Sequence, residues 1–118
     1  SPLTLLVDSG MVKEITGERA DELISILESA GSNATGAGLD GNNVYSIAEL
    51  GIGANPGSSI TGNPLEDEKV LGTAHIAVGD NSTFGGKIEA GVHLDGIIRR
   101  PTLKVGDRFI LKEGIALF

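Results

Sequence analysis

The sequence predicts an α+β domain: a small, strand-rich curled sheet or partial barrel with one or two packed helices. Short apolar runs are separated by turn residues along most of the 118 residues, and 18 glycines imply tight turns more than long helices. Hydrophobic residues make up 40% of the chain and aromatic residues 3%, so the core must be aliphatic. We expect residues 1–118 to form a single domain.

The first elements that we expect are a hairpin and a helix. Apolar residues 3–7 are followed by the turn Asp8-Ser9-Gly10 and by a second run, residues 11–15, which predicts two antiparallel strands. Residues 16–18 are typical of a helix start, and Gly31 of a helix stop. Between them, apolar residues recur with the period of one helical face: Ala20, Leu23, Ile24 and Leu27.

The middle of the chain combines a loop with a strand. Residues 31–43 are rich in Gly, Asn, Ser and Asp, which predicts a loop. Residues 44–52 have strand character, and alternation places Tyr45, Ile47 and Glu49 on one face. A carboxylate beside apolar neighbours is either at a strand end near solvent or held by a cation or metal.

The second half is predicted to contain a short helix and several strands. The acids after Pro64 predict a helix of two or three turns that ends near residue 72 or 73. Residues 74–78 either extend this helix or form a strand, because their periodicity fits both. Further elements are expected at three places: a turn at residues 85–86, a strand over residues 87–98, and a terminal hairpin of residues 103–105 and 108–112.

Bulk properties argue against several classes of function. The formal net charge of −7 disfavours a surface for nucleic acid or an anionic membrane, and no apolar run approaches the roughly 20 residues of a membrane span. Because the chain has no cysteine, any metal must be bound through histidine and oxygen ligands. The chain begins Ser1-Pro2, and we expect it to be a piece of a longer protein.

The two histidines carry the functional argument. His75 and His93 each lie beside glycine-rich sequence that contains acids. In a strand, His93 and Asp95 project to the same side. Two imidazoles and a carboxylate are the ligands that a catalytic zinc or a non-haem iron requires. The alternative is a histidine that hydrogen-bonds a neighbouring carboxylate on a solvated strand.

Acidic residues complete the predicted metal site. Glu49 is the natural fourth ligand, although it could instead be a solvated strand-end acid. Glu68 is a candidate general base that takes a proton from metal-bound water, whereas its neighbours Glu66 and Asp67 are predicted to be solvated. Asp80 is predicted to shape a turn.

Together these motifs resemble the C-terminal part of the aminopeptidase T family of metallo-exopeptidases. The same superfamily includes the iron-dependent 2,5-dihydroxypyridine 5,6-dioxygenases. The likeness covers residues 3–114, and four segments carry it: AELGIGANP at 48–56, EDEK at 66–69, GTAHIAVG at 72–79 and HLDG at 93–96. The resemblance implies the C-terminal metal-binding domain of a longer parent, with the N-terminal domain absent.

The resemblance also implies residue roles. The peptidases hold two metal ions with Glu, Glu, His, His and Asp. By this likeness Glu49 corresponds to the second ligand glutamate, His75 to the first ligand histidine, and His93 and Asp95 to the last two ligands. Glu68 matches the assisting glutamate. The family's first ligand glutamate lies upstream of the matched region, and no tyrosine follows His75, where the peptidases use one.

Three functions follow. The first is a metal-dependent exopeptidase parent, leucyl aminopeptidase-like, that uses zinc, cobalt or manganese. The second is a mononuclear iron ring-cleaving dioxygenase, whose two-histidine-one-carboxylate site would be His75, His93 and Asp95 with ferrous iron. The third is a non-catalytic fold unit, inactive in isolation. The resemblance further implies a peptide or small-molecule substrate, a cytoplasmic location and a homodimer formed through the parent protein.

Overall fold

The structure is a computed structural model that describes residues 3–118. It confirms the α+β class: short strands predominate, and one long helix is present. Two compact units divide the chain: the first comprises the chain up to Glu49 together with Ala77–Leu94, and the second comprises Leu50–Ile76 and Asp95–Phe118. The expected single domain over residues 1–118 stays a prediction.

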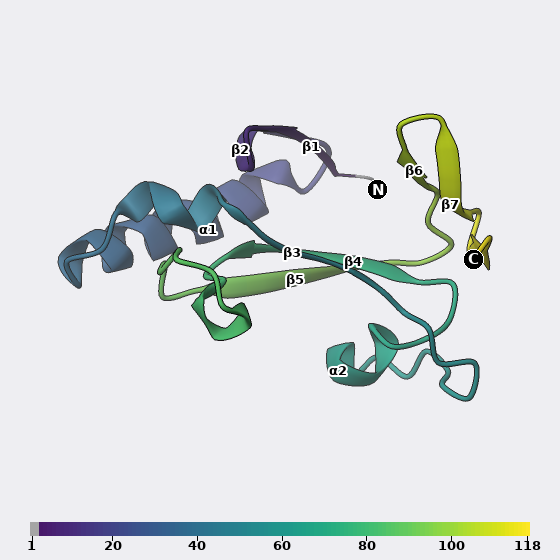
Figure 1. Ribbon diagram of the computed structural model, residues 1–118. Helices are drawn as coiled ribbons and strands as arrows, with labels where there is room; N and C mark the ends of the chain where they lie inside the picture. Colours follow the sequence, from purple (N-terminus) through teal and green to yellow (C-terminus); the bar gives the residue numbers. More distant parts are fainter. Residues whose placement is uncertain (1–2) are drawn as a thin grey trace. The chain divides into compact units, whose positions relative to one another are not determined.

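The strands form three separate, unclosed sheets (Figure 1). The first pairs β1 (Thr4–Asp8) with β2 (Met11–Thr16), the second has the order β3-β4-β5, and the third has the order β6-β7-β8. The bounds of these six strands are Ile47–Ile52 for β3, Ala74–Gly79 for β4, His93–Ile98 for β5, Leu103–Val105 for β6, Arg108–Lys112 for β7 and Ile115–Ala116 for β8.

The hairpin β1–β2 is confirmed where the sequence predicted it. Its strands are antiparallel, with Asp8 opposite Met11 at the turn. Ser9 and Gly10 both have positive φ angles, 54° and 76°, which a tight hairpin turn of two residues requires. The turn residues and the flanking apolar runs therefore specify the same structure.

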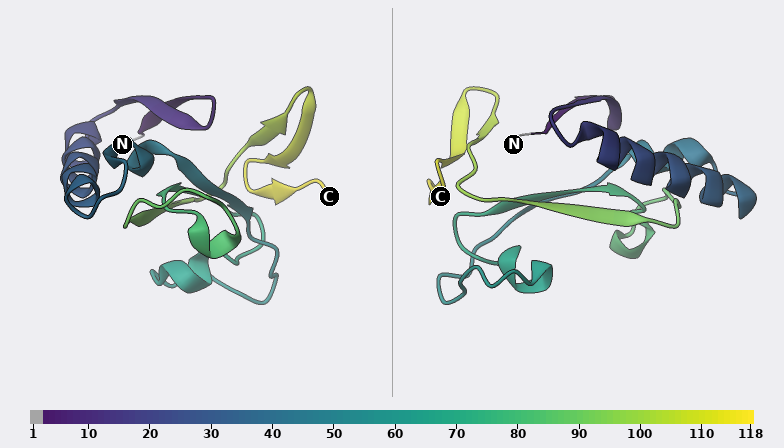
Figure 2. Two further views of the ribbon diagram at one scale, coloured as in Figure 1. Left: turned by 60° about the vertical axis from the view of Figure 1, so that its left-hand side comes forward. Right: turned by 180° about the vertical axis from the view of Figure 1, so that it is seen from behind.

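The helix α1 (Ala20–Gly36) supplies the main apolar face of the first unit. Leu27 is fully buried in a core cluster with one residue of each of four neighbouring segments, namely Val12, Val44, Val78 and Ala90. Figure 2 shows α1 beside the β1–β2 hairpin from two further sides. The stripe that predicted the helix is the side that packs.

The predicted helix stop at Gly31 is wrong. Gly31 lies inside α1, and a Cβ there would come within 3.0 Å of the carbonyl oxygen of Gly41. Gly41 opens the 3-10 helix η1 (Gly41–Tyr45), so the glycine serves a close approach between the two helices. The helix ends instead at Gly36. Gly38, two residues later, has a φ of 84°, and its N–H and that of Leu39 donate to carbonyls of the last turn.

Two other predicted elements are shorter than expected. The helix after Pro64 is a single turn, α2 (Pro64–Asp67). The buried Asp67 carboxylate accepts the N–H groups of Thr61 and Gly62, at 2.8 and 3.1 Å, and so fixes the preceding loop. The strand expected over residues 87–98 begins only at His93. The strand expected over residues 44–52 begins at Ile47, because residues 44 and 45 belong to η1.

The structure also tests the remaining elements that were predicted in the second half of the chain. Residues 74–78, for which helix and strand were both open, lie in β4. The terminal hairpin is confirmed as β6–β7, and β8 extends it to a sheet around the fully buried Leu111. A 3-10 turn, η2 (Ser82–Phe84), occupies the segment before the predicted glycine turn. In the described part of the chain, no helix has the length and apolarity that a membrane crossing needs.

Candidate metal centre

Three of the predicted ligands lie together. Glu49, His93 and Asp95 each offer one ligand atom, and these atoms all lie within 4.8 Å of one another. His93 Nε2 is 3.4 Å from Glu49 Oε2. Asp95 follows two residues after His93 in β5, so alternation projects both side chains to one side of the strand, as the sequence predicted. Ligand atoms around a metal ion at about 2.1 Å are themselves about 3.0–3.4 Å apart.

The contact between Glu49 and His93 passes over the middle strand. The strand order β3-β4-β5 places β4 between them. On β4, alternation places Ala77 and Gly79, which have little or no side chain, on the face of His75. The opposite face is apolar, because Val78 and Leu94 pack in the core of the first unit. By alternation, the face of β4 and β5 opposite to His93 and Asp95 therefore carries core residues.

His93 is held in one tautomer by the main chain. Its Nδ1 lies 2.8 Å from the carbonyl oxygen of Asp80. A carbonyl can only accept, so Nδ1 carries the hydrogen and Nε2 of the neutral ring presents a lone pair. Metal-binding histidines are commonly oriented in this way by a carbonyl on the second ring nitrogen. Sequence reasoning assigned Asp80 to a turn and missed this role, because a main-chain carbonyl leaves no signature in the residue type.

Asp80 itself is firmly hydrogen-bonded. The pKa of its carboxyl is lowered to about 2, first by the Ser82 hydroxyl and then by the N–H groups of Ser82, Ala90 and Gly91. The turn predicted at Asp80 is thus confirmed, and it forms one wall of a small hollow beside His93. This hollow has a volume of about 260 Å³ and is also lined by Ser82, Thr83, Gly91 and Val92.

His75 lies in a different environment. Its Nε2 is 4.0 Å from Glu68 Oε2, and its side chain is 8% exposed. The ring lies against Gly51 of β3, since a Cβ at Gly51 would overlap its Cε1 and Nε2 atoms. Among the described residues, the three-residue ligand group does not include His75. The structure therefore brings Glu49, His93 and Asp95 together and pairs His75 with Glu68, and the full predicted ligand set stays a prediction.

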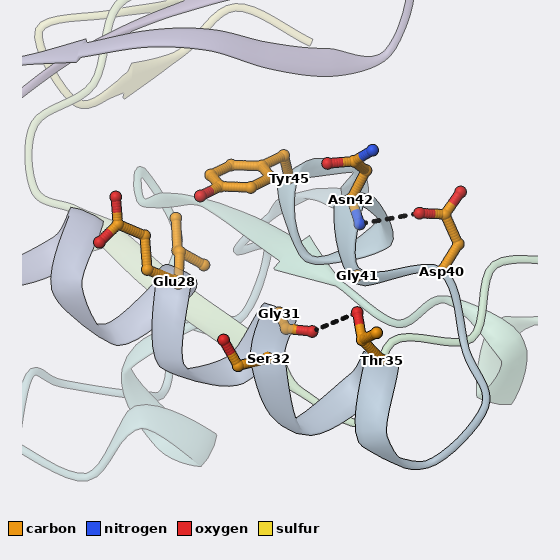
Figure 3. Close-up of a pocket in the computed structure, with 9 residues that line it drawn as sticks. Glu28, Gly31, Ser32, Thr35, Asp40, Gly41, Asn42 and Tyr45 are labelled. Carbon is orange, nitrogen blue, oxygen red and sulfur yellow. Dashed lines mark hydrogen bonds between the residues drawn. The ribbon is translucent and has the colours of Figure 1, made fainter.

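A larger hollow of the first unit contains none of the predicted site residues. It has a volume of about 720 Å³ and lies between α1 and η1 (Figure 3). Carboxylates and hydroxyls line it, among them Glu28, Asp40, Ser32 and Tyr45. None of the residues that line this hollow has an imidazole or a cationic side chain. Its larger volume alone therefore does not make it a candidate metal site.

Comparison with known proteins supports the fold. No protein-family model and no curated protein sequence matches the chain. A solved structure that is similar is the 2,5-dihydroxypyridine dioxygenase of Pseudomonas putida KT2440, with a TM-score of 0.73 and 22% identity. The match covers 98% of this chain and 33% of that protein, so the chain spans about a third of its length. None of these comparisons supports the aminopeptidase T family.

Proposed function

We propose that this chain is the metal-binding part of a dioxygenase-like metalloprotein, in which Glu49, His93 and Asp95 hold one divalent metal ion. The likeness in fold to 2,5-dihydroxypyridine dioxygenase supports the class. The three clustered ligand atoms support the site. The proposal therefore follows the iron-dependent alternative from the sequence rather than the exopeptidase.

A single observation carries the metal site. With Nδ1 donating to the Asp80 carbonyl, Nε2 of His93 is left to face the Glu49 carboxylate at 3.4 Å. Either a proton on Nε2 or a metal ion between the two groups makes this contact attractive, and the nearby Asp95 supplies a third ligand atom for an ion. The exposed fraction of both side chains is about a quarter, 27% for His93 and 26% for Glu49, so an ion can reach them.

The donor set fits the proposed ion. One imidazole and two carboxylates suit ferrous iron, manganese or zinc, and no thiolate is available to favour a softer metal. Bound iron would supply the redox chemistry that dioxygen requires. The residues of the chain supply the rest: Asp80 orients His93, the apolar side of β4 and β5 anchors both strands, and Glu68 near His75 is a candidate proton acceptor.

Metal content tests the proposal. The purified chain is stripped of metal, loaded anaerobically with ferrous iron and analysed for bound metal, beside His93→Ala and Glu49→Gln. We expect one ion per chain in the unmodified protein and a loss in both variants. Glu28→Gln is the matched control, since it is the same substitution on an exposed helix residue. Equal metal in the chain and in His93→Ala would refute the site.

The same measurement separates the rival functions. Two ions per chain, with turnover of amino-acyl anilides, would favour the two-metal exopeptidase over the dioxygenase. His75→Ala tests whether His75 is a further metal ligand. A loss of bound metal in this variant would add His75 to the ligand set, whereas unchanged metal content would leave His75 as the partner of Glu68 only. We expect the chain alone to show no oxygen uptake with 2,5-dihydroxypyridine, because it spans a third of the similar dioxygenase. Robust uptake would refute this expectation.

A further inference from the structure

We infer that Asp80 is a positioning residue for His93: its carboxylate closes the loop of residues 80–91, and the closed loop fixes the main-chain carbonyl that holds His93 Nδ1. The inference rests on the proposed function, because it assigns a residue that prepares the proposed metal ligand. It adds a residue outside the three proposed ligands.

The Asp80 carboxylate ties the two ends of this loop together. One oxygen, Oδ1, accepts the N–H of Ser82 at 2.8 Å and also the Ser82 hydroxyl. The other oxygen, Oδ2, accepts the N–H of Ala90 at 3.0 Å. Ala90 is almost fully buried in the core cluster, so this bond anchors the start of the loop to a rigid part of the first unit.

The main chain of Asp80 forms two hydrogen bonds with the residues that follow the loop. Its N–H donates to the carbonyl of Val92 at 2.7 Å, and its own carbonyl receives His93 Nδ1 at 2.8 Å. Asp80 thus hydrogen-bonds Val92, which precedes β5, and His93, the first residue of β5. Gly79 permits this geometry, because its φ is 109° and a Cβ there would overlap the Val92 carbonyl.

Asn81 closes the inside of the same loop. Its Oδ1 accepts the N–H of Ile88 at 2.9 Å, and its main-chain N–H donates to the Ile88 carbonyl at 3.1 Å. A Cβ at Gly86 would overlap the Asn81 side chain, so a glycine is needed there. Ile88 and Ala90 therefore donate their N–H groups to the side chains of Asn81 and Asp80, and the carbonyls of Ile88 and Val92 accept the main-chain N–H groups of the same two residues. The loop is built around the residue whose carbonyl selects the tautomer of His93.

Two measurements test the assignment. The imidazole ¹⁵N chemical shifts of the metal-free protein report the tautomer, and only two histidines contribute to the spectrum. We expect His93 to carry its hydrogen on Nδ1 in the unmodified chain, and a mixture of tautomers in Asp80→Ala. The dissociation constant for Zn²⁺ is the second readout. We expect it to rise by about 10–100-fold in Asp80→Ala, as for other outer residues of metal sites.

Milder variants separate a local effect on His93 from a general loss of folding. Ser82→Ala removes only the hydroxyl bond, and Asp80→Asn keeps one acceptor oxygen, so both should give smaller shifts in the same direction. Asp40→Ala is the matched control, because Asp40 accepts the N–H of Asn42 at 2.9 Å in the same two-residue pattern but at η1. It should alter neither readout.

The results distinguish this inference from the proposed function. If the unmodified chain binds no Zn²⁺ and no ferrous iron, the metal site fails, while the tautomer comparison still decides the role of Asp80. If the unmodified chain binds metal and Asp80→Ala leaves the His93 tautomer unchanged, the inference is overturned, whether or not affinity falls. A joint change in tautomer and affinity, graded across the variants, supports it.

Discussion

Gly51→Ala tests the contact between β3 and His75. A Cβ at position 51 would overlap the ring of His75, which is 8% exposed on its side chain and faces Glu68 at 4.0 Å. The ring must therefore move within a packed environment or turn away from Glu68. Overpacking of this kind costs about 1–3 kcal/mol, and the relief of glycine's backbone entropy returns about 0.5–1 kcal/mol.

We therefore expect the free energy of unfolding to fall by about 1–2 kcal/mol, which lowers the melting temperature by roughly 4 °C per kcal/mol for a chain of this size. Denaturant unfolding followed by circular dichroism measures the change. The control is Gly36→Ala, since an added Cβ there meets nothing within 4 Å and the residue ends α1. We expect this control to be neutral or slightly stabilising.

A double-mutant cycle identifies the cause. In a His75→Ala background the ring is absent, so Gly51→Ala should become neutral or stabilising, with a coupling of about 1–3 kcal/mol. If the substitution costs the same in both backgrounds, the loss does not arise from the ring, and the packing of His75 against β3 is wrong. If it costs nothing in either background, the ring moves freely and the geometry around His75 carries no constraint.

Three further predictions concern the core, the loop and a glycine turn. Leu27→Ala should lower the free energy of unfolding by about 2–5 kcal/mol, because Leu27 is fully buried, whereas Ile26→Ala, at a side chain that is 52% exposed, should cost far less. The Asp80 pKa is lowered from 3.8 to about 2, so its contribution is complete above pH 3.8 and is lost as the pH falls through about 2. A fall in the exchange protection of the Ala90 and Ser82 amide hydrogens below pH 3.8, relative to their intrinsic exchange rates and absent in Asp80→Ala, would show it. Protection that does not change with pH would contradict it. Gly72→Ala should destabilise the second unit more than Gly62→Ala; both glycines have positive φ, but only at Gly72 would a Cβ overlap the Gly114 carbonyl.

The elements that the sequence predicts well are those whose pattern is local. The stripe of Ala20, Leu23 and Leu27 repeats with the helical period, and this face packs into the core. The β1–β2 hairpin combines two apolar runs with Ser9 and Gly10, whose positive φ angles fit the turn. In such segments the hydrophobic pattern and the turn chemistry specify the same structure.

Two of the wrong boundaries arise where a segment contacts a part of the chain that is not adjacent in the sequence. Residues 87–92 alternate in sequence like a strand, but Asp80 and Asn81 take hydrogen bonds from Ala90 and Ile88, which holds this segment as a loop. Gly31 has the composition of a helix stop, yet it is needed for the approach of Gly41. Both the loop at residues 87–92 and the continuation of the helix through Gly31 depend on partners about ten residues away in the sequence. The local hydrophobic pattern does not reveal such partners.

The candidate site divides in the same way. The same-side placement of His93 and Asp95 follows from the period of two, and so could be predicted. The pairing of His75 with Glu68 could not, because it depends on the short α2 and on the loop between it and β4. Nothing in the sequence alone orders β4 between β3 and β5, so the distance from Glu49 to His93 was not predictable either.

The polar face of the second sheet depends as much on small residues as on ligands. Glu49 Oε2 and His93 Nε2 lie 3.4 Å apart although β4 lies between their strands. Gly79 lets Asp80 approach Val92, which brings the Asp80 carbonyl to His93 Nδ1. A side chain at Gly79 would overlap the Val92 carbonyl and disturb the main chain that holds His93, without changing any ligand. A residue that the composition records only as glycine therefore contributes to how the proposed ligand histidine is held.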